Sequence, residues 1–297
     1  MRRPAPLAAV LLFSLNGCGS DAGPATPTVT PHPMRVMSMN QCTDQLVLAL
    51  LPPSQIASVS WLSRDPVGSL MAARAAKVEV NHGSAEEVLA QKPDLVVAGS
   101  FTTPALRAML KRLGYPLIEV DHANSVADIR RITRQVARAV GEPARGEALI
   151  ARMDAQLAAL ARRPGPAIRV VAWDRTGFAA GEGTLYDAIL QAAGARNLVR
   201  EPATLSYRKP NVEVLLRANP ALLVQGTADA AQPGLGDDLV RHRVVRQYWR
   251  GRTLPIAQGY YVCGTPMIAE AAARLRAGLR TAITRSGPAV PIKEMIR

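Results

Sequence analysis

The chain carries one stretch of sequence twice. Residues 86–99 read EEVLAQKPDLVVAG, and residues 213–226 read EVLLRANPALLVQG. Each copy starts with Glu, continues through an apolar helical stretch, breaks at Pro and ends in an apolar β run closed by Gly. Such a repeat predicts two copies of one helix–turn–strand unit, and therefore two similar lobes with a ligand cleft between them. Chance is the alternative, because helix–Pro–strand junctions are common in α/β proteins.

Strands and helices alternate along the rest of the chain. Apolar, β-branched runs predict strands over 35–39, 56–60, 94–98, 117–120, 168–172 and 253–257. The alternation is typical of an α/β protein with mainly parallel sheets. Gly141-Glu142-Pro143 interrupts it, and a long helical pattern follows from Pro143 to about Arg163. We therefore expect two Rossmann-like α/β lobes joined by a single long α-helix, with the ligand cleft between the lobes.

These patterns divide the chain into six segments. We expect a lipoprotein signal peptide over 1–18, a flexible tether over 19–34, an N-terminal α/β lobe over 35–142, a linker helix over 143–165, a C-terminal α/β lobe over 166–285 and a tail over 286–297.

The first segment has the pattern of an export signal. Arg2 and Arg3 precede an apolar stretch, and Leu15-Asn16-Gly17-Cys18 resembles the bacterial lipobox, although Asn16 is unusual at its place. The resemblance implies that Cys18 becomes the lipid-bearing N-terminus. A soluble secreted protein and an uncleaved anchor are the alternatives. All three put the folded part outside the cytoplasm, and we expect a lipid-anchored protein of the periplasm or cell envelope.

The chain is strongly basic, with 36 Lys and Arg against 23 Asp and Glu, a net charge of +13. Such a charge attracts anionic ligands, lipid head groups or nucleic acid. An exported location argues against nucleic acid as a partner. A solvated, arginine-rich surface explains the charge equally well.

Catalytic and metal-binding motifs are missing from the sequence. There is no Gly-x-Ser-x-Gly elbow, Walker loop or zinc motif. The four histidines, His32, His82, His122 and His242, lack paired ligand spacing, and we interpret them as loop and surface residues. We therefore expect neither an enzyme nor a direct site for a metal ion.

Four stretches together resemble a known family. They are residues 35–40, residues 86–97, the helix after Pro143 and residues 213–224. The chain resembles, over about 35–284, the class III periplasmic substrate-binding proteins of ABC importers, the group for ferric siderophores, cobalamin and haem. The resemblance implies a monomer without a cofactor of its own, which delivers a siderophore, corrinoid or haem chelate to a membrane permease and its ATPase. A ligand-sensing or partner-binding envelope lipoprotein of the same fold is the alternative.

The resemblance also assigns a role to two glutamates. In this family one glutamate on each lobe docks onto arginines of the permease, and the matching positions are Glu86 and Glu213. Each lies near the start of a predicted helix, where the helix dipole favours an anion. Acidic residues are common at such positions for stability alone, which is the simpler explanation.

Candidate ligand-binding residues lie in loops at the carboxyl ends of predicted strands, where ligands gather in open α/β sheets. They are Asn40, Gln41, Trp61, Arg64, Phe101, Trp173, Arg175, Arg208, Tyr260 and Tyr261. Aromatic rings suit a flat or apolar chelate, and arginines suit carboxylates or phosphates on it. Core packing and solvated rim charges are the alternatives. The aromatic residues expected for a cobalamin binder near Val80 and Gly99 are absent, which argues against cobalamin itself but not against another corrinoid.

Two cysteines remain after Cys18. Cys42 opens the first predicted helix and Cys263 precedes the last one. An exported protein can form a disulfide between them, which would clamp the two lobes. Two small buried thiols are the alternative, and the sequence leaves both open.

Overall fold

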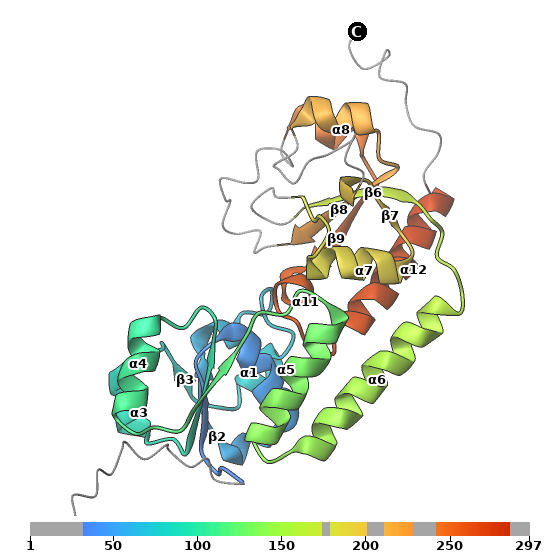
Figure 1. Ribbon diagram of the computed structural model, residues 1–297. Coiled ribbons are helices and arrows are strands. Elements are labelled where there is room, and N and C mark those ends of the chain that lie inside the picture. Colours follow the sequence, from blue (N-terminus) through green and yellow to red (C-terminus); the bar gives the residue numbers. More distant parts are fainter. Residues whose placement is uncertain (1–31, 174–178, 201–210, 228–241, 286–297) are drawn as a thin grey trace, which may run out of the picture.

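The chain folds into two α/β lobes, as the alternation of strands and helices predicts (Figure 1). The computed structural model describes residues 32–173, 179–200, 211–227 and 242–285. Every strand pairing in the two sheets is parallel. The expected fold class, two such lobes, is confirmed.

The N-terminal lobe is built on a five-stranded sheet of order β3-β2-β1-β4-β5. Its strands are β1 (Val36–Ser38), β2 (Ile56–Ser60), β3 (Val80–Asn81), β4 (Leu95–Gly99) and β5 (Leu117–Val120). The chain starts in the middle of the sheet, builds outward to β3 and then reverses to β4. In sheets of this type, ligands bind at the carboxyl ends of the strands where the order reverses, which here is between β1 and β4.

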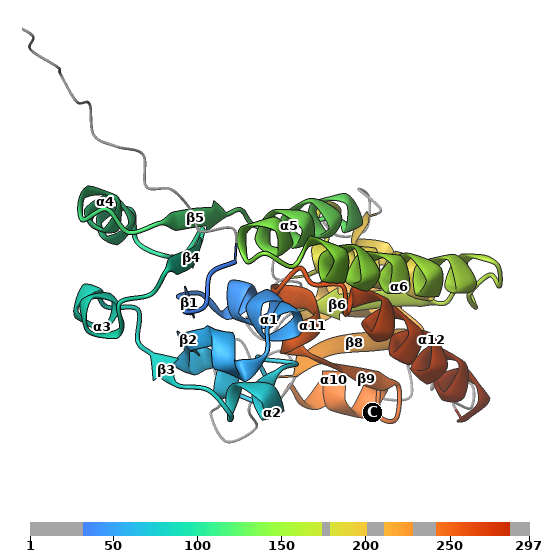
Figure 2. The same ribbon diagram turned by 90° about the horizontal axis from the view of Figure 1, so that it is seen from below.

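Helices cover both faces of this sheet (Figure 2). They are α1 (Gln41–Leu50), α2 (Ala72–Ala75), α3 (Ala85–Gln91), α4 (Pro104–Arg112) and α5 (Val126–Ala139), with short 3-10 turns η1 (Pro53–Gln55) and η2 (Trp61–Arg64). Leu46 of α1 and Ile129 of α5 belong to the large core on one face. Val88 of α3 and Leu110 of α4 pack with Met37 on the other. The strands are buried on both sides, which explains why their sequences are continuously apolar.

The C-terminal lobe repeats this plan on a four-stranded sheet of order β7-β6-β8-β9. Its strands are β6 (Arg169–Trp173), β7 (Arg196–Asn197), β8 (Leu222–Thr227) and β9 (Thr253–Ala257). Its helices are α7 (Leu185–Ala193), the 3-10 turn η3 (Leu198–Arg200), α8 (Val212–Ala218), α10 (Arg243–Tyr248), α11 (Gln258–Val262) and α12 (Ile268–Arg285). α7 and α12 pack on one face of the sheet and α8 on the other (Figure 1). α10 shares the buried cluster of α8 and therefore covers the same face.

The long helix α6 (Pro143–Ala161) lies between the lobes in the chain and runs beside both of them (Figure 1). It contacts α5 of the N-terminal lobe and both α7 and α12 of the C-terminal lobe. Gly146 lets α6 approach α5 closely, because a Cβ there would overlap the side chain of Ala137. Helix α6 ends at Ala161, a few residues before the expected end of the linker at 165. None of the helices in the described ranges is both long and apolar enough to cross a bilayer.

Arg276 of α12 fixes the carboxyl ends of α6 and α7 to each other. Its buried guanidinium donates to the carbonyl oxygens of Leu160 and Arg163 at 2.6 Å each, Ala192 at 2.8 Å and Ala193 at 3.0 Å. A cation is favourable where helix carbonyls lack partners. The end of α6 is therefore held firmly to the C-terminal lobe.

The two copies of the repeat adopt the same local structure. α3 and α8 are seven residues long, with Ser84 and Asn211 as their N-caps. Each ends in a residue of left-handed conformation, Lys92 at φ 47° and Asn219 at φ 45°, just before the repeat proline. The strands β4 and β8 follow. The repeated sequence therefore encodes one helix–turn–strand unit in each lobe.

Candidate functional site

The lobes meet at a disulfide between Cys42 and Cys263. Their Cα atoms lie 4.8 Å apart, at the start of α1 and at the end of α11. Nearby, the N–H of Gly259 donates to the carbonyl of Val67 at 3.1 Å. Of the two alternatives that the sequence leaves open, the structure has the bonded form. The segment around α11 thus belongs to the C-terminal lobe but lies against the N-terminal lobe.

A small pocket of about 20 Å³ opens beside this disulfide, at the carboxyl ends of β1, β4 and β5. Its walls include Asn40, Cys42, Phe101, His122 and Gly264. The pocket therefore lies at the reversal point of the strand order, where ligands are expected, and at the junction of the lobes.

Asn40 has a structural task at this pocket. As the N-cap of α1, its Oδ1 accepts the N–H of Cys42 at 2.9 Å. Gly99 lies against it, because a Cβ at position 99 would be 2.6 Å from Cγ of Asn40. Asn40 thus lines the pocket in one fixed orientation and holds the start of α1 there.

Two exposed aromatic side chains lie at the same edge of the sheet. Phe101, after β4, is 75% exposed and Trp61, after β2, is 53% exposed. Phe101 packs edge-on against His122, with ring centroids 6.0 Å apart. Large apolar side chains left this open at a cleft are characteristic of a binding surface.

The side-chain N–H groups of Gln41 and Arg64 donate to backbone carbonyls of the N-terminal lobe. Gln41 Nε2 donates to the carbonyl of Gly68 at 2.8 Å. Arg64 Nη2 donates to the carbonyl of Val78 at 2.7 Å, and its Nε to that of Ala75 at 3.4 Å. Both side chains therefore shape the loop that carries Trp61.

The candidate ligand-binding residues of the C-terminal lobe are more buried than their predicted loop positions suggest. Trp173 is 1% exposed and belongs to the core with Trp249. Tyr260 is also buried, and its ring faces the guanidinium of Arg274 at 5.9 Å. Burial raises the pKa of Tyr260 above its usual value, and the carboxylate of Glu270 adds to this effect.

Tyr261 packs against other residues of the C-terminal lobe. Its ring stacks on Tyr186 at 4.5 Å between centroids, and a Cβ at Gly226 would overlap its hydroxyl. Tyr261 therefore lies at the carboxyl end of β8. Arg175 and Arg208 lie outside the described residues, as do Cys18 and the tail over 286–297.

His122 is an exposed loop residue, as the sequence predicts, and it also lines the pocket beside Phe101, a position that the sequence analysis did not assign to it. A signal was available, because His122 follows the predicted strand 117–120 by two residues and so belongs to the ligand-binding edge. Within the described ranges, no three His, Cys, Asp or Glu side chains gather as they would around a bare metal ion.

Asp44 is buried beneath the loop that carries Trp61. Its Oδ2 accepts the N–H of Ser60 at 3.2 Å and the hydroxyl of the same residue. Burial raises the pKa of Asp44 to about 7, against the opposing effect of its hydrogen bonds with Ser38 and Ser60. This carboxyl ties α1 to the end of β2, immediately before Trp61.

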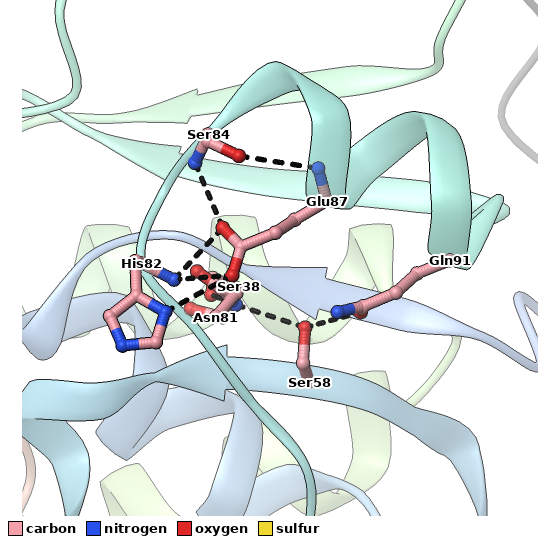
Figure 3. A network of polar contacts seen from close by, with 7 residues as sticks. All are labelled: Ser38, Ser58, Asn81, His82, Ser84, Glu87 and Gln91. Carbon is pink, nitrogen blue, oxygen red and sulfur yellow. Dashed lines mark hydrogen bonds and ion pairs between the residues drawn. The ribbon is translucent and has the colours of Figure 1, made fainter.

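Glu86 and Glu213 occupy equivalent places on the two lobes. Each is the second residue of its helix, α3 or α8, and each is exposed. The neighbouring Glu87 is used differently (Figure 3): its carboxylate accepts the N–H of Ser84 at 3.0 Å and that of His82 at 2.9 Å. Partial burial raises the pKa of Glu87, but the hydrogen bonds from Ser84 and His82 outweigh it and hold that pKa below its usual value.

A polar chain anchors the other end of α3 to the sheet (Figure 3). Gln91 Oε1 accepts the hydroxyl of Ser58 at 2.6 Å. Asn81 Nδ2 donates to Ser58 Oγ and to the carbonyl of Ser38, at 2.9 Å each. Glu86 therefore projects from a helix that is fixed at both ends.

Comparisons with known proteins agree with this architecture. A family model described as periplasmic binding protein matches residues 36–248. A cobalamin-binding protein of Halobacterium salinarum is 25% identical over 273 residues, which are 86% of this chain and 72% of that protein. The periplasmic heme-binding protein RhuT of Roseiflexus sp. RS-1, in its apo form, superposes with a TM-score of 0.68 at 24% identity, over 84% of this chain and 98% of RhuT. The periplasmic vitamin B12-binding protein BtuF of Vibrio cholerae gives 0.60 at 17% identity, over 85% and 99%.

Proposed function

This chain belongs to the periplasmic binding protein family, and we propose that it captures a metal chelate and delivers it to an ABC importer. Membership implies a solute-binding role and a periplasmic location. The family consists of substrate-binding proteins rather than enzymes, which agrees with the lack of catalytic motifs. The relatives named above bind haem, cobalamin or vitamin B12. The proposed ligand is a corrinoid, a haem or a ferric siderophore, carried as cargo and not kept as a cofactor.

The observation that carries the capture step is the pair of exposed aromatic rings, Trp61 and Phe101, at one edge of the N-terminal sheet. They flank the loop after β1, next to the pocket that holds Asn40 and His122. Exposed aromatic rings beside a pocket with both apolar and polar walls suit a large, flat and largely apolar molecule with polar groups at its edge. A chelate of the proposed class has this chemistry.

The lobe junction limits how the cleft can move. The disulfide and the long helix α6 join the lobes at separate places, and Arg276 fixes the end of α6 to the C-terminal lobe. We infer that capture uses a small tilt of the lobes rather than a wide closure, because each of these links resists a large rotation.

Docking on the permease is proposed to use Glu86 and Glu213. Support comes from their equivalent helical positions, their exposure and their places on different lobes. Two like charges on two similar lobes suit a partner with matching pseudo-symmetry and cationic side chains. We propose in addition that Cys18 carries lipid and keeps the protein at the membrane. A sensor of the same fold without a transport role remains the competing proposal.

Tryptophan fluorescence tests the capture step. The protein without residues 1–18 is titrated with haem, cobinamide, cobalamin and several ferric siderophores. Trp61 is exposed while Trp173 and Trp249 are buried, so quenching is expected to report mainly on Trp61. Saturable quenching by one class, lost in Trp61→Ala, would identify the cargo.

Phe101 offers a second readout with a matched control. Phe101→Ala should weaken binding of the chelate identified in this way at least tenfold, as measured by calorimetry. Leu113→Ala, another exposed apolar residue of the same lobe, should leave it unchanged. Failure of every compound to bind would contradict the proposal and favour the sensor.

A further inference from the structure

A second cavity lies between the lobes, separate from the pocket beside the disulfide. The two share only Leu46 among their lining residues. Its walls come from α1 and α2 of the N-terminal lobe, from α6, and from residues 265–267 before α12. Its volume is about 330 Å³, which is at the lower end of the size range of small-molecule sites, roughly 300–1,000 Å³.

Three arginines line this cavity, and no acidic residue does. Arg145 and Arg152 are seven residues apart on α6 and therefore share one face of the helix. The acidic residues of α6 lie on another face and are already used: Glu147 pairs with Arg134 at 2.7 Å, and Asp154 pairs with Arg130 at 2.8 Å.

The third arginine, Arg74 of α2, donates to the carbonyl of Leu51 at 3.1 Å. In the part of the chain that the structure describes, none of the three arginines at the cavity has a carboxylate partner. Three guanidinium groups around one cavity form a strong potential for an anion.

Gln45 supplies an independent sign of a missing partner. It lines the cavity and is 0% exposed. Its Oε1 accepts the N–H of Leu70 at 3.2 Å, but its Nε2 has no hydrogen-bond partner among the described residues. Buried polar groups are nearly always paired, so the unused Nε2 donor of Gln45 is consistent with an acceptor on the cavity side of this residue.

Apart from Thr265, the rest of the wall is apolar, with Leu149 of α6 and Met267 beside the arginines. We propose that this cavity binds an amphipathic anion, a molecule with a carboxylate or phosphate head and a short apolar chain. The arginines and Gln45 would bind the head, and the apolar wall would cover the chain. This site is distinct from the cleft proposed for the chelate, and the proposal does not depend on the nature of the chelate.

Methionine NMR gives a local test, because Met71 and Met267 both line the cavity. Protein labelled at the methionine methyl groups is titrated with decanoate, decyl phosphate, decanol and inorganic phosphate, all below micelle-forming concentrations. We expect saturable shifts at Met71 and Met267 with decanoate, decyl phosphate or both. The two compounds distinguish a carboxylate head from a phosphate head. Decanol lacks the charge and inorganic phosphate lacks the chain, so each should bind at least tenfold more weakly.

Charge removal tests the arginines. Arg145→Gln/Arg152→Gln should weaken binding of the charged amphiphile at least tenfold. Arg162→Gln is the control and should not change it, because Arg162 is an exposed arginine just beyond the carboxyl end of α6 and does not line the cavity. Both sites are on the surface of α6, so circular dichroism is expected to show unchanged folding.

Any of four results would overturn the proposal. The first three are equal binding by the double variant and the control, shifts that do not involve Met71 and Met267, and equal binding of decanol. Tight binding of inorganic phosphate alone would also overturn it, because it would leave the apolar wall without a role. None of these results bears on chelate capture, which is measured separately at Trp61.

Discussion

Arg35 and Arg169 make the same hydrogen bond in different lobes. Arg35 Nη2 donates to the carbonyl of Gln91, the last residue of α3, at 2.7 Å. Arg169 Nη2 donates to the carbonyl of Ala218, the last residue of α8, at 2.6 Å. Each arginine stands at the start of the first strand of its lobe. The internal duplication therefore extends beyond the repeated stretch, and it gives Glu86 and Glu213 equivalent structural settings.

Reversal of both exposed glutamates should abolish delivery without affecting capture. In Glu86→Lys/Glu213→Lys, uptake by cells should fall at least tenfold, because the charges that face a cationic permease surface are inverted. The affinity of the purified protein for its ligand should be unchanged by calorimetry. Glu79→Lys makes the same change at another exposed glutamate of the N-terminal lobe and is the control. Normal uptake by the double variant would disprove the docking role.

The disulfide should contribute strongly to stability. It joins residues 221 positions apart, and closure of so long a loop restricts the unfolded chain. Cys42→Ser/Cys263→Ser should lower the free energy of unfolding by about 4 kcal/mol. Urea denaturation of the protein without residues 1–18, with and without reductant, measures this. Reductant should not affect the serine variant, and equal midpoints for the oxidised and reduced wild type would contradict the prediction.

Asp44 should make stability depend on pH. Its folded pKa of about 7 is above the usual 3.8, so the folded protein holds a proton that the unfolded chain releases. Below pH 4 this protonated carboxyl stabilises the folded protein by about 4 kcal/mol. The stabilisation is lost as the pH rises from 4 to 7.

Asp44→Asn is expected to remove this dependence, because the amide resembles the protonated carboxyl and does not titrate. Denaturation midpoints of the wild type and the variant are compared from pH 4 to 8. The stability of the variant relative to the wild type should rise with pH. Parallel curves would show that the burial of Asp44 does not shift its titration.

Arg276 should be the most important single side chain of α12 for stability. Arg276→Met leaves four helix-end carbonyls without their donor, and the free energy of unfolding should fall by about 3 kcal/mol. Arg274→Met is the control, because its exposed pair with Glu270 is worth less than about 1 kcal/mol. Thermal denaturation measures both variants. If Arg276→Met and Arg274→Met lowered the melting temperature equally, the buried hydrogen bonds of Arg276 would contribute nothing to stability.

Local patterns were sufficient to predict the two lobes. Hydrophobic periodicity, capping residues and the repeat are properties of neighbouring residues, so they predict strands, helices and the equivalence of α3 and α8. They also placed Asn40, Trp61 and Phe101 at the carboxyl ends of strands, where the structure has them.

Side-chain direction could not be read in the same way. Trp173 ends β6 and lies on the same face of the sheet as Val171, two residues earlier, so it packs into the core. The sequence suggested that the Arg64 side chain is available for a ligand. Its actual partners are the backbone carbonyls of Ala75 and Val78, and backbone partners cannot be recognised from the identity of a residue. A partial signal existed for Arg276: it lies in register with the buried Ala272 and Leu279, on the apolar stripe of its helix.

The bond between Cys42 and Cys263 also sets an order for maturation. Cys263 is made 221 residues after Cys42, so the bond cannot form until both lobes have been almost completely synthesised. Cys42 must therefore stay a free thiol while the second lobe is completed. The chain has three cysteines, and lipid on Cys18 would remove the only competitor. Cys42 and Cys263 would then be the only free thiols and could pair only with each other. Their bond would form only in molecules whose lobes have already come together.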